Sequence, residues 1–253
     1  MKIEIYAPHR WSNVRPLLQA LRETWGRDVK LLRNPNVEPE GDGLINWGGI
    51  HSTIANLNSR LPINKHKELS LMKAAGVLVP VFAAGISDIP IREIGYEVGQ
   101  MMPRSLHHRA AADLLSHTHT TGAALYVQRV PVEHEFRIHV FRPHPAEDRW
   151  LSIRAGLKVK VREDAHPWIR TLGQGWNTDY GEACMSILRD YSIVRDAAKA
   201  AVKAVGLDFG AVDVGLSGGY ATVFEVNGAP GLANAATAAA YARHINKRIP
   251  SED

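Results

Sequence analysis

Three side chains in the C-terminal part of the 253-residue chain have types and a spacing that suit the binding of a metal ion. Asp213 lies twelve residues before Glu225, and Asn227 follows two residues later. Two carboxylates within about 5 Å of each other disfavour each other's charge unless a cation lies between them. Magnesium takes oxygen ligands and is usually held by one or two carboxylates together with phosphate oxygens. The three residues therefore predict a magnesium site, with manganese as an alternative ion and a solvent-exposed polar face as the alternative interpretation.

The residues around these side chains predict the hairpin that brings them together. Segments 211–216 and 221–227 are rich in valine and flank Ser217-Gly218-Gly219, which is typical of two antiparallel strands joined by a tight loop. A pairing of Asp213 directly opposite Glu225 requires a loop with an odd number of residues. We expect three residues with a glycine bulge. A two-residue turn would put the carboxylates on opposite faces.

A second group of charged residues lies on a predicted strand further upstream. Glu135, Arg137 and His139 alternate with apolar residues, so one face of this strand is charged. Basic residues then recur from Arg129 to Arg170. Such a cluster suits polyphosphate, or alternatively an acidic polymer. A solvated outer face of an antiparallel sheet is the other interpretation.

Composition favours a cytoplasmic protein with a large core. The net charge of +4, from 30 Lys and Arg against 26 Asp and Glu, is mild and does not indicate a nucleic-acid partner. We expect neither export nor a membrane partner, because the first residues are charged and no apolar run reaches transmembrane length. Cys184 is the single cysteine, which excludes an internal disulfide, and we expect a packed thiol there.

The sequence also predicts the elements that position these residues. The first fifty residues indicate a strand, a helix capped by Ser12 and two further strands. A helix is expected over residues 64 to 75, followed by a Val-Leu-Val-Pro strand. A long helix is expected from Ile187 to Val205, with Tyr191 among its core residues. There is no repeat and no long linker, so we expect lobes joined by short connections.

In order along the chain, four segments resemble motifs of the ATP-grasp superfamily. The last motif is matched by Asp213, Glu225-Val226-Asn227 and Pro230-Gly231-Leu232. The helix that opens with a lysine is matched by LPINKHKELSLMKAAGVLVP, and the adenine-binding linker with its ribose-binding acid by YVQRVPVEHEFRIHVF. The nucleotide-covering loop of compact ligases is matched by PRSLHHRAAADLL. Together these segments span residues 60 to 245.

The resemblance implies an α+β fold in which two lobes hold ATP between them, preceded here by a shortened α/β lobe. We expect this pre-ATP-grasp lobe at residues 1–58, ATP-grasp subdomain A at 59–129, and subdomain B with the metal-binding hairpin at 130–253. The most similar type is the compact carboxylate-amine ligase, which includes glutamate ligases that modify ribosomal proteins and small phage-type ligases.

The resemblance also implies roles for individual residues. The magnesium ligands are Asp213, Glu225 and Asn227. The nucleotide is contacted by Lys65 (with Lys67 as the alternative), Arg104, the backbone from Gln128 to Val130, and Glu135 on the ribose. The catalytic cations are Arg137, Lys158 (with Lys160 as the alternative) and Arg170, although Thr171 stands where the family has asparagine.

The activity implied is that of an ATP-dependent, ADP-forming carboxylate-amine ligase that acts through an acyl phosphate. Its substrate is expected to be a small molecule, an amino acid or a peptide, with a protein-borne substrate as an alternative. A kinase of the same fold and a non-catalytic ATP-binding regulatory protein are the other hypotheses. Residues 104 to 122 are expected to form a closing lid, and His107, His108, His117 and His119 to lie on a loop rather than to bind zinc.

Overall fold

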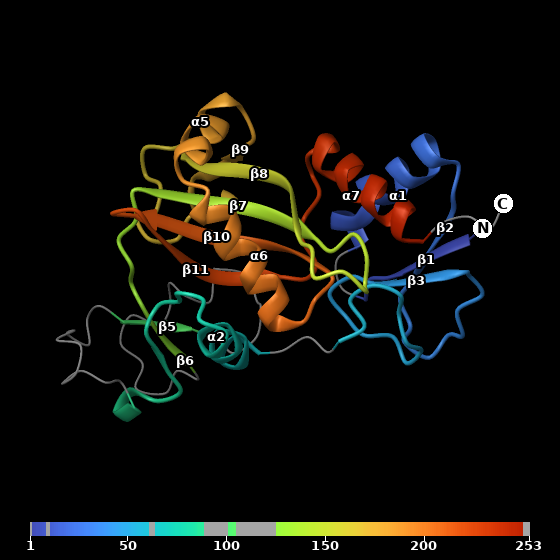
Figure 1. Ribbon diagram of the computed structural model, residues 1–253, viewed down its shortest axis with the longest axis horizontal. Coiled ribbons are helices and arrows are strands. Elements are labelled where there is room, and N and C mark those ends of the chain that lie inside the picture. Colours follow the sequence, from blue (N-terminus) through green and yellow to red (C-terminus); the bar gives the residue numbers. More distant parts are fainter. Residues whose placement is uncertain (1, 9–10, 61–63, 89–100, 105–124, 250–253) are drawn as a thin grey trace.

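The computed structural model describes residues 2–8, 11–60, 64–88, 101–104 and 125–249. Within these ranges the chain forms three β-sheets and the helices that pack on them, an α+β architecture as the sequence predicts (Figure 1). In the same ranges, no helix has both the length and the apolar character that crossing a membrane requires.

A central sheet of five strands carries most of the charged residues singled out above. Its strands are all antiparallel, in the order β11-β10-β7-β8-β9. They are β7 (His134–Phe141), β8 (Leu151–Lys160), β9 (Trp176–Asp179), β10 (Phe209–Ser217) and β11 (Tyr220–Asn227). Helix α6 (Ile193–Val205) packs on one face, and α5 (Glu182–Asp190) lies against β8 (Figure 1).

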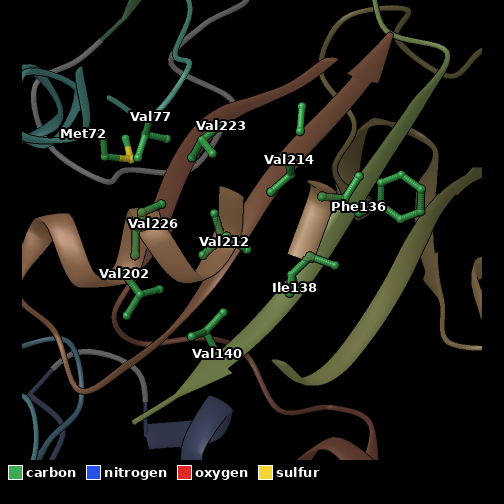
Figure 2. Close-up of a cluster of buried hydrophobic side chains, with 14 of the residues drawn as sticks. Met72, Val77, Phe136, Ile138, Val140, Val202, Val212, Val214, Val223 and Val226 are labelled. Atoms are coloured by element: carbon green, nitrogen blue, oxygen red, sulfur yellow. The ribbon is translucent and has the colours of Figure 1, made fainter. Parts of the chain in front are cut away.

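The apolar face of the central sheet is the main hydrophobic core. Alternate residues of β7 and β10 point toward α6, and residues of β11 continue the core toward α2 (Lys65–Ala74). Figure 2 shows this cluster, which includes Met72, Val77, Phe136, Ile138, Val140, Val202, Val212, Val214, Val223 and Val226. Because side chains alternate along a strand, the residues between these apolar ones face the opposite side, where the charged residues gather.

A small antiparallel sheet with the order β4-β6-β5 belongs to the segment that precedes the central sheet. Its strands are β4 (Phe82–Ala83), β5 (Met101–Arg104) and β6 (Leu125–Gln128), and a short 3-10 helix, η1 (Ile86–Asp88), follows β4. Asn64 caps α2 by accepting a hydrogen bond from the Lys67 amide. The expected strand over 77–80 is absent. Leu78 lies instead beside β11, where the Val223 amide donates to its carbonyl at 2.8 Å.

The N-terminal lobe has a parallel sheet with the order β2-β1-β3. Its elements are β1 (Lys2–Tyr6), α1 (Trp11–Trp25), β2 (Asp28–Leu32) and β3 (Gly43–Asn46). The last helix, α7 (Ala235–Arg248), lies beside α1, and its Tyr241 and Ile245 share a core with Ile3 and Leu17 (Figure 1). Helix α7 thus completes the core of the first lobe. The expected domain boundaries at residues 58 and 129 stay a prediction.

Two expectations about helices are wrong. Tyr191 and Ser192 separate α5 from α6, because Tyr191 leaves the helical conformation at φ −124°, ψ 68°. Tyr191 is consequently 39% exposed rather than part of the core. Ser12 is not the residue before the first helix, since α1 already includes Trp11.

The hairpin between β10 and β11 pairs Asp213 with Glu225 by a different route from the one expected. Ser217 pairs with Tyr220, so the loop has two residues, Gly218 and Gly219, with φ of +56° and +80°. Positive φ at both positions is the requirement of the tight hairpin turn. The register then shifts beyond Val214, which pairs with Val223, so that Phe224 is an extra residue. This bulge, rather than a three-residue loop, restores both carboxylates to one face.

Replacing Gly219 by alanine is expected to lower the free energy of unfolding by about 1 kcal/mol, because an L-residue at positive φ is strained. An added Cβ would meet no described atom within 4 Å, so crowding does not contribute. Urea unfolding followed by circular dichroism measures the change. Gly173→Ala is the matched control, because that position is equally open and its φ is not positive. Equal losses in the two variants would contradict the turn conformation.

Candidate functional site

Asp213 lies at the centre of a charged cluster on the polar face of the central sheet. Arg137 donates two hydrogen bonds to its carboxylate, from Nε to Oδ1 and from an Nη to Oδ2, both at 2.9 Å. The Lys158 ammonium bridges two acids, with 2.8 Å to Asp213 and 2.5 Å to Glu135. Asp213, Glu135 and Lys158 are each less than a tenth exposed. Charges so removed from water need partners of opposite sign, and here each has one.

The register of three strands brings these side chains together. Asp213 of β10 lies opposite Arg137 of β7, which in turn lies opposite Gly156 of β8. Glycine is required at position 156, since an added Cβ would lie 2.4 Å from a Thr178 methyl and 2.9 Å from the Tyr180 ring. Lys158 is one pleat further along β8 and on the same face as Gly156.

Two cations that contact Glu225 come from the two ATP-grasp-like segments that precede the central sheet. The Lys65 ammonium, at the start of α2, is 3.1 Å from Oε2 of Glu225, and an Nη of Arg104, at the end of β5, is 3.7 Å from the same atom. Glu68 fixes α2 against the hairpin by accepting a hydrogen bond from the buried Val226 amide at 2.7 Å. Cations therefore contact the hairpin both from the central sheet and from α2 and β5.

Asn227 stands on the same face of β11 as Glu225, opposite Ala211. Its side-chain oxygen accepts a hydrogen bond from the Ala229 amide at 2.9 Å, which orients the side chain and leaves a second lone pair on that oxygen. The first lobe borders this turn, because a Cβ on Gly48, at φ +78°, would lie 2.7 Å from Cβ of Ala229.

The predicted cations fall into two groups by position. Arg170 lies in a loop and joins the cluster, with its Nε 3.7 Å from a Glu135 carboxylate oxygen. An Nη of Arg170 donates to the Val132 carbonyl at 3.0 Å, and the guanidinium lies 4.6 Å from the Trp176 ring centre. Each of the alternative lysines, Lys67 and Lys160, is exposed, and neither is in an ion pair with a described residue. The structure thus brings Lys65 and Lys158 into the site and leaves their alternatives outside it.

The predicted adenine linker begins at the end of β6. The Gln128 amide donates to the Val81 carbonyl at 2.7 Å, and its side-chain oxygen accepts from the Val81 amide at 3.2 Å. The backbone donor of Gln128 is therefore engaged within the sheet. Val130 lies two residues beyond the strand and is partly exposed. Most of the predicted lid and the histidines at 107, 108, 117 and 119 lie outside the described residues.

Burial and charge act in opposite directions on the two inner carboxyl groups. Burial raises the pKa of Asp213, but the Arg137 and Lys158 charges outweigh it, so the net pKa is lowered. For Glu135 burial, together with the nearby Asp213 charge, outweighs the Lys158 and Arg170 charges, so the pKa is raised. Of these two groups, Asp213 therefore stays ionised more readily.

The donor set fits a magnesium–polyphosphate complex. Three carboxylates are contacted by five cations (Lys65, Arg104, Arg137, Lys158 and Arg170), which leaves a formal excess of two positive charges among the described residues. No group of three His, Cys, Asp or Glu side chains in the described part of the chain is arranged for a metal. A metal here would depend on two carboxylates, the Asn227 oxygen and oxygens of a ligand, which is how magnesium is commonly held.

The contacts of several residues beside the site were not predicted from the sequence. His139 is fully buried between two tyrosines: Nδ1 is 3.2 Å from the Tyr241 hydroxyl and Nε2 is 3.2 Å from the Tyr180 hydroxyl. Arg154 stacks on the Tyr180 ring. Alternation places Arg154 on the same face as Lys158 and could have indicated it, whereas Glu68 and Tyr180 carry no local signal.

This arrangement of sheets and helices is the ATP-grasp fold. No protein-family model matches the sequence, and neither does any curated protein. The likeness is to solved structures, at low sequence identity and over most of the chain.

Among these structures is the ATP-grasp ligase PsnB complexed with a minimal precursor, at 16% identity and a TM-score of 0.58, with 90% of each chain covered. The D-alanine–D-alanine ligase from Bacillus anthracis has 13% identity and a TM-score of 0.60, covering 92% of this chain and 88% of that one. N5-carboxyaminoimidazole synthetase from Staphylococcus aureus has 12% identity and a TM-score of 0.60, covering 90% and 70%. One structure of PsnB holds Mg and ADP, and one of the B. anthracis ligase holds ATP.

Stability is expected to fall as the pH drops below 6.5, because burial, followed by the Arg137 charge, lowers the pKa of His139 to about 3. Between these values the unfolded histidine binds a proton that the folded one does not, so the loss at pH 5 relative to neutral pH is about 2 kcal/mol. Urea unfolding at several pH values measures it. The variant His139→Gln should show a correspondingly weaker pH dependence, and equal pH dependence in both proteins would contradict a neutral buried His139.

Proposed function

We propose that the protein is an ATP-dependent, ADP-forming carboxylate-amine ligase that acts through an acyl phosphate. The pairing of Asp213 with Glu225 carries the proposal, because it joins two carboxylates within a ring of cations drawn from both sides of the hairpin. The ATP-grasp fold supports an ATP-dependent ligase, since the solved structures named above are ligases and synthetases.

Asp213, Glu225 and Asn227 are the residues that would hold magnesium, or manganese in its place. The bound ion would neutralise charge on the ATP phosphates and orient them. In the structure Lys158 and Arg137 contact Asp213, and Lys65 and Arg104 contact Glu225, so the two carboxylates already lie among the groups that phosphates require.

The cations of this chain supply the electrostatic part of the proposed reaction. Lys65 and Arg104 would bind the nucleotide phosphates from one side, while Arg137, Lys158 and Arg170 would face the transferred phosphoryl group and the acyl substrate from the other. Preorganised cations in a site shielded from water stabilise developing negative charge by several kcal/mol. The Arg137–Asp213 and Lys158–Glu135 contacts hold two of these cations in place before any ligand binds.

The reaction itself has two steps. A carboxylate oxygen of the substrate bonds to the γ-phosphorus while the bond to the ADP oxygen breaks, which gives an acyl phosphate. An amine then bonds to the acyl carbon, inorganic phosphate leaves and the amine loses a proton. The amine and carboxylate partners are proposed to be an amino acid, a peptide or another small molecule.

Changing Glu225 to glutamine is expected to abolish ADP release, because it removes one carboxylate from the Lys65 and Arg104 contacts and from the proposed metal site. The assay follows ADP and phosphate release with Mg·ATP and pooled amino acids and peptides. Glu133→Gln is the matched control, since Glu133 is exposed and its oxygen accepts from the Gly218 amide, a contact that glutamine keeps. Near-normal turnover by Glu225→Gln, with an unchanged circular dichroism spectrum, would remove Glu225 from the site.

Mass spectrometry of the product separates the proposed ligase from a kinase, because a ligase joins two substrates and a kinase leaves phosphate on one. A regulatory protein would bind the nucleotide and release no phosphate with any acceptor.

Changing Lys65 to methionine is expected to weaken Mg·ADP binding about tenfold or more, because a charged hydrogen bond contributes about 1.5–3 kcal/mol. Lys67→Met should change the affinity less than about twofold, since Lys67 is exposed two residues away on the same helix. Isothermal titration calorimetry of both variants makes the comparison. Equal effects of the two substitutions would mean that Lys65 does not contact the nucleotide.

A further inference from the structure

One cation on the charged face of the central sheet lacks the kind of partner that the others have. Arg137, Lys158 and Arg170 each contact a carboxylate. Arg154, on β8, is partly buried and has no hydrogen-bond or ion-pair partner among the described residues. Its Nε is buried without an acceptor. A partly desolvated guanidinium in this state gains most from a ligand that brings a negative charge.

The position of Arg154 relates it to the proposed reaction centre. Arg154 lies directly opposite His139 on β7, and the next pair on the same face is Gly156 opposite Arg137. Two residues along a strand advance the chain by about 7 Å, so Arg154 stands one row from the row of Arg137 and Asp213. A register shift next to His139 makes Ile153 an extra residue, and such bulges redirect neighbouring side chains.

The guanidinium of Arg154 lies over the ring of Tyr180. The guanidinium carbon is 5.0 Å from the centre of the Tyr180 ring, a stacked arrangement that leaves the hydrogen-bonding edge of the fork unused. The Tyr180 ring occupies the space that Gly156 leaves open. Tyr180 therefore fixes the direction of Arg154 without neutralising it.

A chain of hydrogen bonds through the buried Tyr241 and His139 side chains fixes Tyr180 in turn. The Tyr241 hydroxyl donates to the Gly210 carbonyl at 3.4 Å, so its oxygen accepts from Nδ1–H of His139 at 3.2 Å. Nε2 of His139 is then left to accept the Tyr180 hydroxyl proton, at 3.2 Å. His139 is neutral in this arrangement and does not balance the charge of Arg154, and no described carboxylate forms an ion pair with Arg154.

We propose that Arg154, stacked on Tyr180, binds a carboxylate of the non-nucleotide substrate that is recognised but not phosphorylated. The inference rests on the proposed ligase function and specifies its substrate class: a molecule that carries a carboxylate about one strand row from its reacting group. A planar guanidinium matches a carboxylate through two parallel hydrogen bonds. The cations proposed for the nucleotide phosphates, Lys65 and Arg104, lie instead at the far side of the Asp213–Glu225 pair.

The test follows the Nε–H resonance of Arg154 by nuclear magnetic resonance, assigned by its absence in Arg154→Gln. N-acetylglycine is the probe, and N-acetylglycinamide, which lacks the charge, is its matched counterpart. Each is titrated with and without saturating Mg·ADP. The carboxylate should shift the Arg154 resonance saturably and the amide should not. The variant should bind N-acetylglycine about tenfold or more weakly.

Arg142 is the internal control, because it also stacks on an aromatic ring, that of Trp150 at 5.6 Å, but its Nε donates to the Glu147 carbonyl at 3.2 Å. Its resonance should not respond. No saturable shift at Arg154 would overturn the proposal, and so would a shift caused by Mg·ADP alone, which would make Arg154 a phosphate ligand. Calorimetry with Mg·ADP tests the proposed function separately: absence of nucleotide binding would refute the ligase, while the titration without nucleotide still decides the carboxylate site.

Discussion

The structure depends on the ion pairs that neutralise acidic side chains buried on the central sheet. Asp213 and Glu135 are each 7% exposed, and an unpaired charge at that depth costs several kcal/mol. Lys158 contacts both acids, and Arg137 binds Asp213 through two hydrogen bonds. These contacts need the registers of β7, β8 and β10 to be correct together, because a slip of one residue would turn the charged side chains into the apolar core.

Ion pairs of the same kind also connect the central sheet to the segment that precedes it. Glu225 stands at the edge of the central sheet and takes its cations from α2 and β5, so the segment before the central sheet is bound to the hairpin by charge as well as by the apolar core shown in Figure 2. Glu68 adds a buried hydrogen bond to the β11 backbone. Phosphate oxygens and a bound cation would take the place of the ion-pair partners that these side chains already have. The side chains would therefore have to move little when the ligand binds.

The pairing of Asp213 with Glu225 was predicted, but through a three-residue loop rather than through the bulge that produces it. The extra residue that restores their register, Phe224, has no local sequence signature. Its ring and a Val132 methyl approach Gly215 so closely that a Cβ there would meet both. Alternation also treated Lys158 and Lys160 as equal, and burial, which depends on β9 and the following loop, distinguishes them. The contact of Tyr180 with His139 and Arg154 joins β7, β8 and the residue after β9, and no spacing in the sequence encodes it.

The short first lobe has a structural consequence for the site. Its core is completed by α7, so the chain between Asn227 and that helix is anchored at both ends. Tyr241 of α7 reaches from this core to His139 on the polar face of the sheet. The first lobe, the end of the hairpin that carries Asn227 and the hydrogen bonds that hold Tyr180 therefore share one packed unit. A substrate bound at Arg154 would contact a surface whose geometry is set by the first lobe, although Arg154 itself lies on the central sheet.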